Sequence, residues 1–553
     1  MSALGMTLFS CCMSLAPVLA SSVEVPLLGE MQKRYLQLPR ETRVAHFADA
    51  AFRSNLVYAG WHPLPVILPF RHVRGGRSVT VTDASSGRVV YLGDASGACA
   101  KVWNLEIGRS YVWSAHDEQG VQLARGEFRT EDMAPRLLKV PGVLNFRDLG
   151  GRRGLDGRRV RQGRVFRSAG LNDNAYEEFY SVDETRARLG GDAYDGLVSS
   201  GNARIAFWND VREGRKKISF AQCFVSEAWA VTVGEDRKLA KPDVRGLLRI
   251  REGVRGDFAA EARIEIDLVA SADGWCAVDV GADWFYALSV NGDRVIDRLT
   301  DGSGFDPRAE RNLRMPLQVH AGTNSVVAVV RPGDLSWVFR LRLVDASCVG
   351  IGALADAAAS ESTLALKRCT SEVFKRRVAG KCRLDDEGRH YMTNSLGIRT
   401  DIDLRGPHET FGMTGSPLGG NVMWIPRSSA AYGNITNAFG RAAFANVFKV
   451  FLDDRNYPID FHCIAGQDRT GTVAFILNAL LGVEDEELYK DWEVTGFWNP
   501  KVSFVHKGNF DDLVAAFSVF PGGTLRERVE GFVLSLGFSD KDIALFRRLM
   551  LED

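Results

Sequence analysis

Residues 40–132 alternate between apolar and polar positions in short runs that are separated by turns rich in Gly, Ser and Asp. Two of these runs are residues 78–82 and 88–92, which the turn Asp-Ala-Ser-Ser-Gly joins. Alternation with a period of two is typical of strands with one buried face, and such turns commonly connect strands. The pattern therefore predicts an all-β sandwich over residues 40–132.

A second β-rich block extends over residues 220–346. In residues 262–268 every second side chain is apolar and the intervening ones are charged. The pair Asn291-Gly292 follows another strand-like run, and Asn-Gly in this position is a strong signal for a tight hairpin. These features predict a second β-sandwich.

The C-terminal part of the chain has a different pattern. A short run at 459–461 leads into a glycine-containing loop, and apolar residues then recur at helical spacing between Val473 and Leu481. Gly482 lies where a glycine commonly ends a helix. The order strand, loop, helix predicts an α/β domain.

The composition is ordinary for a soluble globular protein of about three or four domains. The chain has 553 residues, of which 45% are hydrophobic and 25% are charged. Lys+Arg and Asp+Glu both number 69, so the formal net charge is zero. Because general nucleic-acid-binding proteins normally carry a basic excess or a basic stripe, we expect no nucleic-acid partner.

The first twenty residues resemble a secretory signal peptide. Residues 6–20 are apolar or small, and Val18-Leu19-Ala20 suits a cleavage site. The first five residues contain no Lys or Arg, so a helical or disordered extension is the alternative. No other apolar run is long enough to cross a bilayer. We therefore expect a periplasmic or secreted protein without a transmembrane span.

The nine cysteines include no CxxC pair, which gives no support for a zinc ribbon or a thioredoxin-like motif. Cys369 and Cys382 are close enough in sequence to form a disulfide in an oxidising compartment. They could equally be free thiols.

The residues that point to a chemical function lie at 462–471, where the chain reads His-Cys-Ile-Ala-Gly-Gln-Asp-Arg-Thr-Gly. Five residues separate Cys463 from Arg469, and a loop of that length can direct successive backbone N–H groups at one centre. The N-terminus of the following helix, predicted near Thr470, adds its positive end. Such a loop binds a tetrahedral dianion and favours the thiolate form of Cys463.

Two side chains of the loop region suit phosphate chemistry. The guanidinium of Arg469 can hold two phosphoryl oxygens, and Thr470 can hydrogen-bond the sulfur of Cys463. A buried structural cysteine is the alternative interpretation, but the whole string disfavours it. The predicted phosphate-binding residues are Ile464, Ala465, Gly466, Gln467, Asp468, Arg469 and Thr470.

The string has the form HCxxGxxRT, the signature of the cysteine-dependent protein tyrosine phosphatase superfamily. Two other motifs narrow the resemblance: Asn-Phe-Arg-Asp-Leu-Gly-Gly at 145–151, followed by Val-Phe-Arg-Ser at 165–168, and Leu-Gly-Ile-Arg-Thr-Asp-Ile-Asp-Leu-Arg at 396–405. In this order they resemble the atypical bacterial tyrosine phosphatase family over residues 136–172 and 384–553. The resemblance implies an α/β phosphatase domain in two pieces.

Two features depart from that family. Ser168 and Leu396 are 228 residues apart, whereas family members usually join these motifs within a few dozen residues. The block at 220–346 is therefore predicted to be inserted into the phosphatase. Position 467 is Gln, where family members that act on phosphoinositides often carry Lys. Gln467 supplies no second cation, which disfavours phosphoinositide substrates.

The general acid has two candidates. Many tyrosine phosphatases carry an Asp on a separate loop before the cysteine, but residues 422–450 contain no Asp or Glu. Asp468 lies inside the loop and Asp403 lies at the end of a predicted strand, and either could protonate the leaving oxygen. Asp403 could instead be a structural partner of Arg405, and Asp468 a loop-shaping acceptor. His408 and Glu409 are the next candidates.

Five residues are predicted to lie behind those that contact phosphate: His462, Asn145, Arg147, Asp148 and Arg405. His462 would orient the loop and tune the thiolate rather than bind a metal, because no cluster of ligands adjoins it. The others could line the site or brace one loop against another. We expect no metal and no organic cofactor.

Both β-rich blocks resemble modules that accompany enzyme domains. Residues 102–113 and 127–130 resemble the late strands of a fibronectin type III domain. The order of strands in 220–346 resembles the galactose-binding-like jelly rolls of many extracellular hydrolases. Four aromatic residues of this block could meet the substrate or a glycan, but we expect at least two of them in its core: Trp284, Phe285, Tyr286 and Trp337.

These patterns predict a multidomain protein with an α/β cysteine-dependent phosphatase domain and two all-β sandwich domains. Cys463, Arg469 and either Asp468 or Asp403 would hydrolyse a phosphate monoester through a cysteinyl-phosphate. The expected substrate is a phosphorylated protein, acted on with tyrosine or dual specificity, or a small phosphate ester. The alternatives are an inositol polyphosphate or phosphoinositide phosphatase, and a phosphate-binding pseudophosphatase whose β-domains bind glycans or mediate adhesion. The presence of both Cys463 and Arg469 disfavours the pseudophosphatase.

Overall fold

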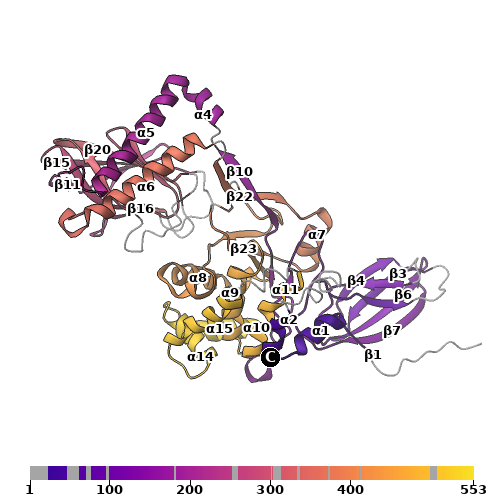
Figure 1. The fold of residues 1–553 in the computed structure, drawn as a ribbon. Coiled ribbons are helices and arrows are strands. Elements are labelled where there is room, and N and C mark those ends of the chain that lie inside the picture. Colours follow the sequence, from indigo (N-terminus) through magenta and orange to yellow (C-terminus); the bar gives the residue numbers. More distant parts are fainter. Residues whose placement is uncertain are drawn as a thin grey trace, which may run out of the picture. The chain divides into compact units, whose positions relative to one another are not determined.

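The computed structural model (Figure 1) describes residues 23–46, 62–69, 76–94, 99–179, 182–251, 260–299, 302, 313–332, 337–371, 374–407, 409–410, 413–498 and 507–553. The predicted signal peptide and His408 lie outside the described residues. Within these ranges, no helix has the length and apolar character needed to cross a membrane. The chain divides into two compact units, residues 1–34 with 62–139 and residues 35–61 with 140–553.

The first unit contains a five-stranded sheet in the order β1-β7-β6-β3-β4 and a two-stranded sheet of β2 and β5. The two runs that were predicted from alternation fall on β3 and β4, and Val79 and Val81 of β3 are buried in the core of this unit. Because β1 pairs in parallel with β7, the sheet begins before residue 40. The strands are β1 (Val23–Val25), β2 (Val66–Pro69), β3 (Gly76–Asp83), β4 (Val89–Asp94), β5 (Cys99–Val102), β6 (Ser110–Asp117) and β7 (Gln122–Thr130). Helix α1 (Glu30–Gln37) begins in this unit, and α2 (Arg40–His46) belongs to the second unit.

The second unit is organised around a five-stranded sheet in the order β24-β23-β25-β9-β8. Neighbouring strands are parallel except for the pair β8 and β9. Every residue of β8, β9, β23 and β25 is buried, which places these strands in the interior of the domain. The strands are β8 (Arg147–Asp148), β9 (Val165–Ser168), β23 (Thr400–Asp403), β24 (Met423–Pro426) and β25 (Ile459–His462).

Helices pack around this sheet and share one hydrophobic core with it. Residues 470–480 of α9 are all buried, so α9 is the central helix of the domain. Helices α14 and α15 each begin with a capping box, at Thr524 and Ser539. The helices are α7 (Asp386–His390), α8 (Ala438–Phe451), α9 (Asp468–Leu480), α10 (Asp485–Glu493), α11 (Thr495–Trp498), α13 (Lys507–Ala516), α14 (Leu525–Leu534) and α15 (Asp540–Met550).

A two-stranded antiparallel ribbon begins and ends the long segment between β9 and β23. The chain leaves through β10 (Asn172–Phe179) and returns through β22 (Phe374–Cys382), with Asn172 opposite Cys382. Three helices lie in the segment between these two strands: α4 (Val182–Leu189), α5 (Gly191–Arg212) and α6 (Ile351–Thr370). Helices α5 and α6 lie side by side (Figure 1). An insertion is readily accommodated where both of its ends lie close together, and the paired strands provide that.

Two antiparallel sheets enclose a separate hydrophobic core in the inserted block. One has the order β13-β12-β15-β20-β17-β18, with β11 also paired to β15, and the other has the order β14-β21-β16-β19. In β15, the even-numbered residues are buried and the intervening ones are half-buried or exposed, as the alternation predicted. The strands are β11 (Cys223–Val225), β12 (Trp229–Val233), β13 (Asp236–Ala240), β14 (Leu247–Arg251), β15 (Ala262–Ala270), β16 (Gly274–Ala282), β17 (Tyr286–Val290), β18 (Asp293–Asp297), β19 (Leu313–Val319), β20 (Gly322–Val330) and β21 (Trp337–Val344).

The predicted Asn-Gly turn and the four aromatic residues singled out in this block are all described by the structure. Asn291 and Gly292 form the two-residue turn between β17 and β18, and both have positive φ angles. The four aromatic residues at 284–286 and 337 are all buried, at most 8% exposed, so none of them offers a face to a glycan. Outside this block, Cys369 in α6 and Cys382 at the end of β22 are both free thiols.

Candidate active site

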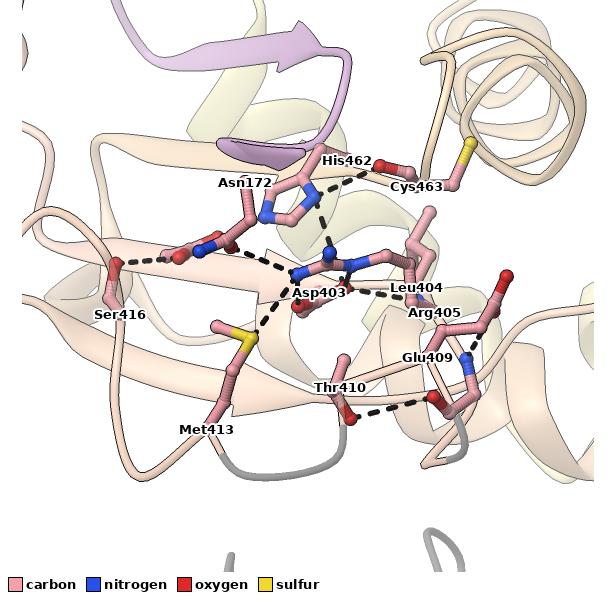
Figure 2. A network of polar contacts seen from close by, with 12 residues as sticks. Asn172, Asp403, Leu404, Arg405, Glu409, Thr410, Met413, Ser416, His462 and Cys463 are labelled. Carbon is pink, nitrogen blue, oxygen red and sulfur yellow. Dashed lines mark hydrogen bonds and ion pairs between the residues drawn. The ribbon is translucent and has the colours of Figure 1, made fainter. Parts of the chain in front are cut away.

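Cys463 lies directly after β25, the central strand of the sheet, and α9 begins at Asp468. The helix therefore starts two residues earlier than predicted, and the loop between strand and helix is 463–467. The Cys463 side chain is buried, and Figure 2 shows its thiol turned away from the His462 imidazole. The cysteine thus lies at the positive N-terminal end of the central helix.

Gly466 lets this loop approach the neighbouring strand β9. Its φ angle is +67°, in the left-handed region that favours glycine. A Cβ atom at this position would lie 2.4 Å from the carbonyl oxygen of Ser168, at the end of β9. Both the backbone conformation and the available space therefore require glycine here.

Arg469 is held in place by Glu409, which the sequence offered only as an alternative acid. Nη1 and Nη2 of Arg469 donate to the two carboxylate oxygens of Glu409, the second at 3.2 Å. Glu409 is 4% exposed and also accepts a hydrogen bond of 2.8 Å from the backbone N–H of Gly406. Burial by itself lowers the pKa of Arg469, but the charge of Glu409 outweighs it and the pKa is raised. The guanidinium is consequently charged and its orientation is set before a ligand arrives.

Removing this carboxylate should impair catalysis without touching the nucleophile. We expect Glu409→Ala to lower kcat/KM for an aryl phosphate by about 10²-fold, because a misplaced guanidinium no longer meets the phosphoryl oxygens. Steady-state kinetics on p-nitrophenyl phosphate would measure this. Glu409→Gln, which retains a hydrogen-bond acceptor for Arg469, should lose less activity. Wild-type kinetics for Glu409→Ala would show that the ion pair does not position Arg469.

Asp468 is half-buried at the first turn of α9, and its carboxylate accepts a hydrogen bond from the hydroxyl of Tyr432. Tyr432 is itself fixed, because its backbone N–H donates to Oγ1 of Thr472 at 2.8 Å. Burial and the nearby charge of Asp468 raise the pKa of Tyr432, so the phenol keeps its proton and remains a donor. This leaves Asp468 oriented and partly accessible.

Asp403, the other predicted acid, has a different environment at the end of β23. Nε and Nη2 of Arg405 donate to its two carboxylate oxygens at 2.8 and 2.6 Å. Burial by itself raises the pKa of Asp403, but the charges of Arg405 and His462 outweigh burial and lower this pKa to about 2. A carboxylate held in this state has no proton to donate near neutral pH. The geometry fits the structural interpretation, in which Asp403 is the partner of Arg405.

His462 is fully buried between the carboxylates of Asp401 and Asp403. Its Nε2 atom lies 2.9 Å from Oδ1 of Asp401, and its Nδ1 atom lies 3.8 Å from Oδ1 of Asp403 and 3.3 Å from the carbonyl oxygen of Cys463. Burial lowers the pKa of His462, but the two carboxylates raise it to about 9. A protonated imidazole would thus hold the backbone of Cys463 from behind, which fits the predicted orienting role. Among the residues that the structure describes, no three His, Cys, Asp or Glu side chains are grouped as metal ligands.

The motif at 145–151 reaches the loop through one residue. Nδ2 of Asn145 donates to the carbonyl oxygens of Ala465 and Gly466 at 2.9 and 3.2 Å. Arg147 donates to Oδ1 of Asn145 at 2.5 Å and supports it. The Asp148 carboxylate accepts from the backbone N–H groups of Gly150 and Gly163 and therefore braces two other loops.

Two further residues, to which the motifs assigned no role, complete this side of the site. Nη2 of Arg167, in β9, donates to the carbonyl oxygen of Gly466 at 2.6 Å, and Nη1 donates to Asp491. Asp491 lies in α10, and three arginines hold its pKa well below the usual range although burial raises it. The sequence did contain a signal for Arg167, because a charged residue inside a short apolar strand needs a buried partner.

Two polar residues at the start of α9 have no partner. Oγ1 of Thr470 and both polar side-chain atoms of Gln467 are buried and make no hydrogen bond to any described residue. The hydrogen bond that the sequence predicted from Thr470 to the sulfur of Cys463 is thus not formed among the described residues. Gln467 is fully buried and shows no polar group to solvent.

A family comparison matches the region that contains this site. The model of the tyrosine phosphatase family matches residues 138–186 and 371–514. The two matched segments contain Asn145, Arg167, Glu409, Cys463 and Arg469, and the inserted sheets lie between them. The two segments are thus similar to the tyrosine phosphatase family, and the inserted sheets separate them. No curated protein matches this chain.

Two solved structures that match the chain are glycoside hydrolases. The GH31 alpha-xylosidase from Xanthomonas citri is 10% identical, with a TM-score of 0.17, over 62% of this chain and 30% of that one. The alpha-L-rhamnosidase from Streptomyces avermitilis, complexed with L-rhamnose, is 13% identical, with a TM-score of 0.10, over 52% of this chain and 22% of that one. This chain thus covers less than a third of either protein.

Proposed function

We propose that this protein is a cysteine-dependent phosphatase that hydrolyses phosphate monoesters, with phosphotyrosine in a protein as the first substrate to test. One observation carries the proposal: Cys463 begins a tight loop at the N-terminus of a buried helix, and Glu409 holds the guanidinium of Arg469 at the same loop. This arrangement combines a nucleophile, a source of positive potential and an oriented fork for two oxyanion atoms. The match to the tyrosine phosphatase family supports it.

The proposed reaction has two steps. The Cys463 thiolate attacks phosphorus, the bond from phosphorus to the ester oxygen breaks, and Asp468 donates its proton to that oxygen. Water then attacks the cysteinyl-phosphate and gives a proton to the Asp468 carboxylate, and the thiolate departs as inorganic phosphate is formed. Arg469 and the backbone N–H groups of the loop stabilise the equatorial oxygens in both steps.

We assign the acid role to Asp468 rather than to Asp403. Asp468 is the first residue of α9, directly after the loop that carries Cys463, is half-buried, and accepts a hydrogen bond from the neutral hydroxyl of Tyr432. Asp403 is fully buried and its carboxylate is paired with Arg405. A general acid must reach the leaving oxygen and exchange its proton, and the half-buried Asp468 suits both conditions better than the buried, paired Asp403.

The substrate class follows from charge. A multiply phosphorylated headgroup needs cations beyond the loop arginine, and Gln467 supplies none at the position where phosphoinositide phosphatases of the resembled family often carry Lys. This favours a singly phosphorylated residue, with tyrosine or dual specificity. We also propose that the protein acts outside the cytoplasm, on the basis of the signal-like residues 1–20.

A substrate panel tests the proposal. Phosphotyrosine peptide, phosphoserine peptide, a phosphoinositide and inositol hexakisphosphate would be compared by phosphate release, with and without a strong chelator. We expect the highest kcat/KM for the phosphotyrosine peptide and no effect of the chelator. Preference for inositol hexakisphosphate would replace the substrate class, and activity that is lost with chelator and restored by a divalent cation would refute the cysteine mechanism.

A further inference from the structure

Three consecutive carbonyl groups of the loop are bound by donors from the same side. The carbonyl oxygen of Ile464 accepts from the backbone N–H of Gly170 at 3.0 Å. Those of Ala465 and Gly466 accept from Asn145, and that of Gly466 also accepts from Arg167. These donors belong to β9, to the residues just after it and to the segment that leads into β8. They lie on one side of β25 in the sheet order, whereas Glu409 follows β23 on the other side.

The direction of these carbonyl groups determines where the neighbouring N–H groups point. In a trans peptide, the C=O of one residue and the N–H of the next point in opposite directions. Because the carbonyls of 464, 465 and 466 are turned toward β9, the N–H groups of Ala465, Gly466 and Gln467 are turned away from it. No described residue accepts a hydrogen bond from these three N–H groups. Successive N–H groups directed to one side form an anion-binding concavity.

The two side chains that hold the carbonyls are themselves locked. Arg167 and Arg147 both donate to Asp491, and Arg147 also donates to Asn145. Arg152 adds a third guanidinium, at 3.1 Å from Oδ1 of Asp491. All four side chains of this ion cluster are at most 3% exposed.

This cluster is costly for the fold. Burying several charges together is generally less favourable than burying apolar side chains of the same volume, and here Asp491 meets three guanidinium groups while Glu487 lies 3.8 Å from Arg152. Burial and the neighbouring charge of Arg167 lower the pKa of Arg147 to about 9, although Asp491 raises it. Stability alone therefore does not account for the cluster, whereas a requirement to hold loop carbonyls in one direction does.

We propose that Asn145 and Arg167 are positioning residues that orient the backbone N–H groups of the loop toward a bound phosphate. The inference rests on the proposed function insofar as it takes the loop to be a phosphate site. It goes further in assigning the preorganisation of the loop to two side chains that need not touch the substrate. A planar donor with two partners is required at 167, because one guanidinium bonds Gly466 and Asp491 at the same time.

The experiment measures the affinity for tungstate, a tetrahedral oxyanion, by calorimetry in a Cys463→Ser background. Arg167→Lys keeps the charge but cannot bond both partners as a planar fork. Asn145→Gly permits the observed φ of +52° and removes the amide. We expect each to raise the Kd for tungstate by about tenfold or more, as the loss of a preorganised oxyanion donor does. Thermal unfolding would establish that each variant is folded.

Arg152→Lys is the matched control, because it makes the same substitution in the same buried cluster at a residue that has no bond to the loop. We expect its Kd for tungstate to stay within about threefold of the parent, since the loop carbonyls keep their donors. Parental affinity in both Arg167→Lys and Asn145→Gly would overturn the inference, as would an equal loss in Arg152→Lys. If the Cys463→Ser protein binds tungstate but the wild-type protein hydrolyses no phosphate ester, the proposed function fails. The tungstate Kd values of the three variants would still decide whether Asn145 and Arg167 position the loop.

Discussion

Replacing Cys463 with serine is expected to lower kcat on p-nitrophenyl phosphate by at least about 10⁴-fold, because the attacking group is removed. Binding of tungstate should survive, because the loop N–H groups and Arg469 remain. Arg469→Ala should lose both turnover and binding, since it removes the guanidinium that Glu409 orients. Steady-state kinetics and calorimetry on the two variants would separate these results.

The exposed free thiol Cys382 supplies the control for cysteine substitution in general. Cys382→Ser should retain wild-type kinetics, because this residue lies at the end of β22 and makes no contact with the loop among the described residues. Substantial turnover by Cys463→Ser would show that another group attacks phosphorus. The proposed mechanism would then have to be abandoned.

Asp468→Asn and Asp403→Asn are expected to differ in how strongly kcat depends on the leaving group of the phosphate ester. With an alkyl phosphate, Asp468→Asn should lower kcat by about 10²–10⁴-fold, because the leaving oxygen then departs without a proton. With p-nitrophenyl phosphate, whose leaving group needs little protonation, the loss should be much smaller. A series of phosphate esters with leaving groups of different acidity would measure the contrast.

Asp403→Asn should instead lower the free energy of unfolding. It leaves the buried guanidinium of Arg405 without its carboxylate, and breaking a buried pair costs about 3 kcal/mol or more of unfolding free energy. Urea denaturation would measure the loss, and the remaining folded enzyme should show no dependence on the leaving group beyond that of wild type. A steep dependence in Asp403→Asn together with none in Asp468→Asn would reverse the assignment of the acid.

Several local features follow from residues that are adjacent in the chain. The alternation in 262–268 forms β15 with its apolar side chains buried, and Asn291-Gly292 forms the two-residue turn that its backbone preferences favour. The spacing of Cys463, Gly466 and Arg469 likewise produces a tight loop between a strand and a helix. In each case the signal is a short-range property, such as side-chain period, φ preference or loop length.

The partners of the charged residues could not be obtained in this way. Arg469 meets Glu409 across 60 residues of sequence, and Arg167 meets Gly466 across 299. Neither pairing has a periodic signature, because both depend on which strands become neighbours in the sheet. The motif at 396–405 drew attention to Asp403, but only the ion pair with Arg405 distinguishes a structural carboxylate from an acid.

Contiguous residues therefore predict the proposed nucleophile, the loop that carries it and the insertion between the two phosphatase-like segments, because each of these has a short-range signature. The tertiary structure decided how that loop is held: Asn145, Gly170 and Arg167 bind its carbonyls on one side of β25, and Glu409 binds its arginine on the other. The physical reason is that buried charges and peptide dipoles must find partners, and a parallel sheet brings those partners together from distant parts of the chain.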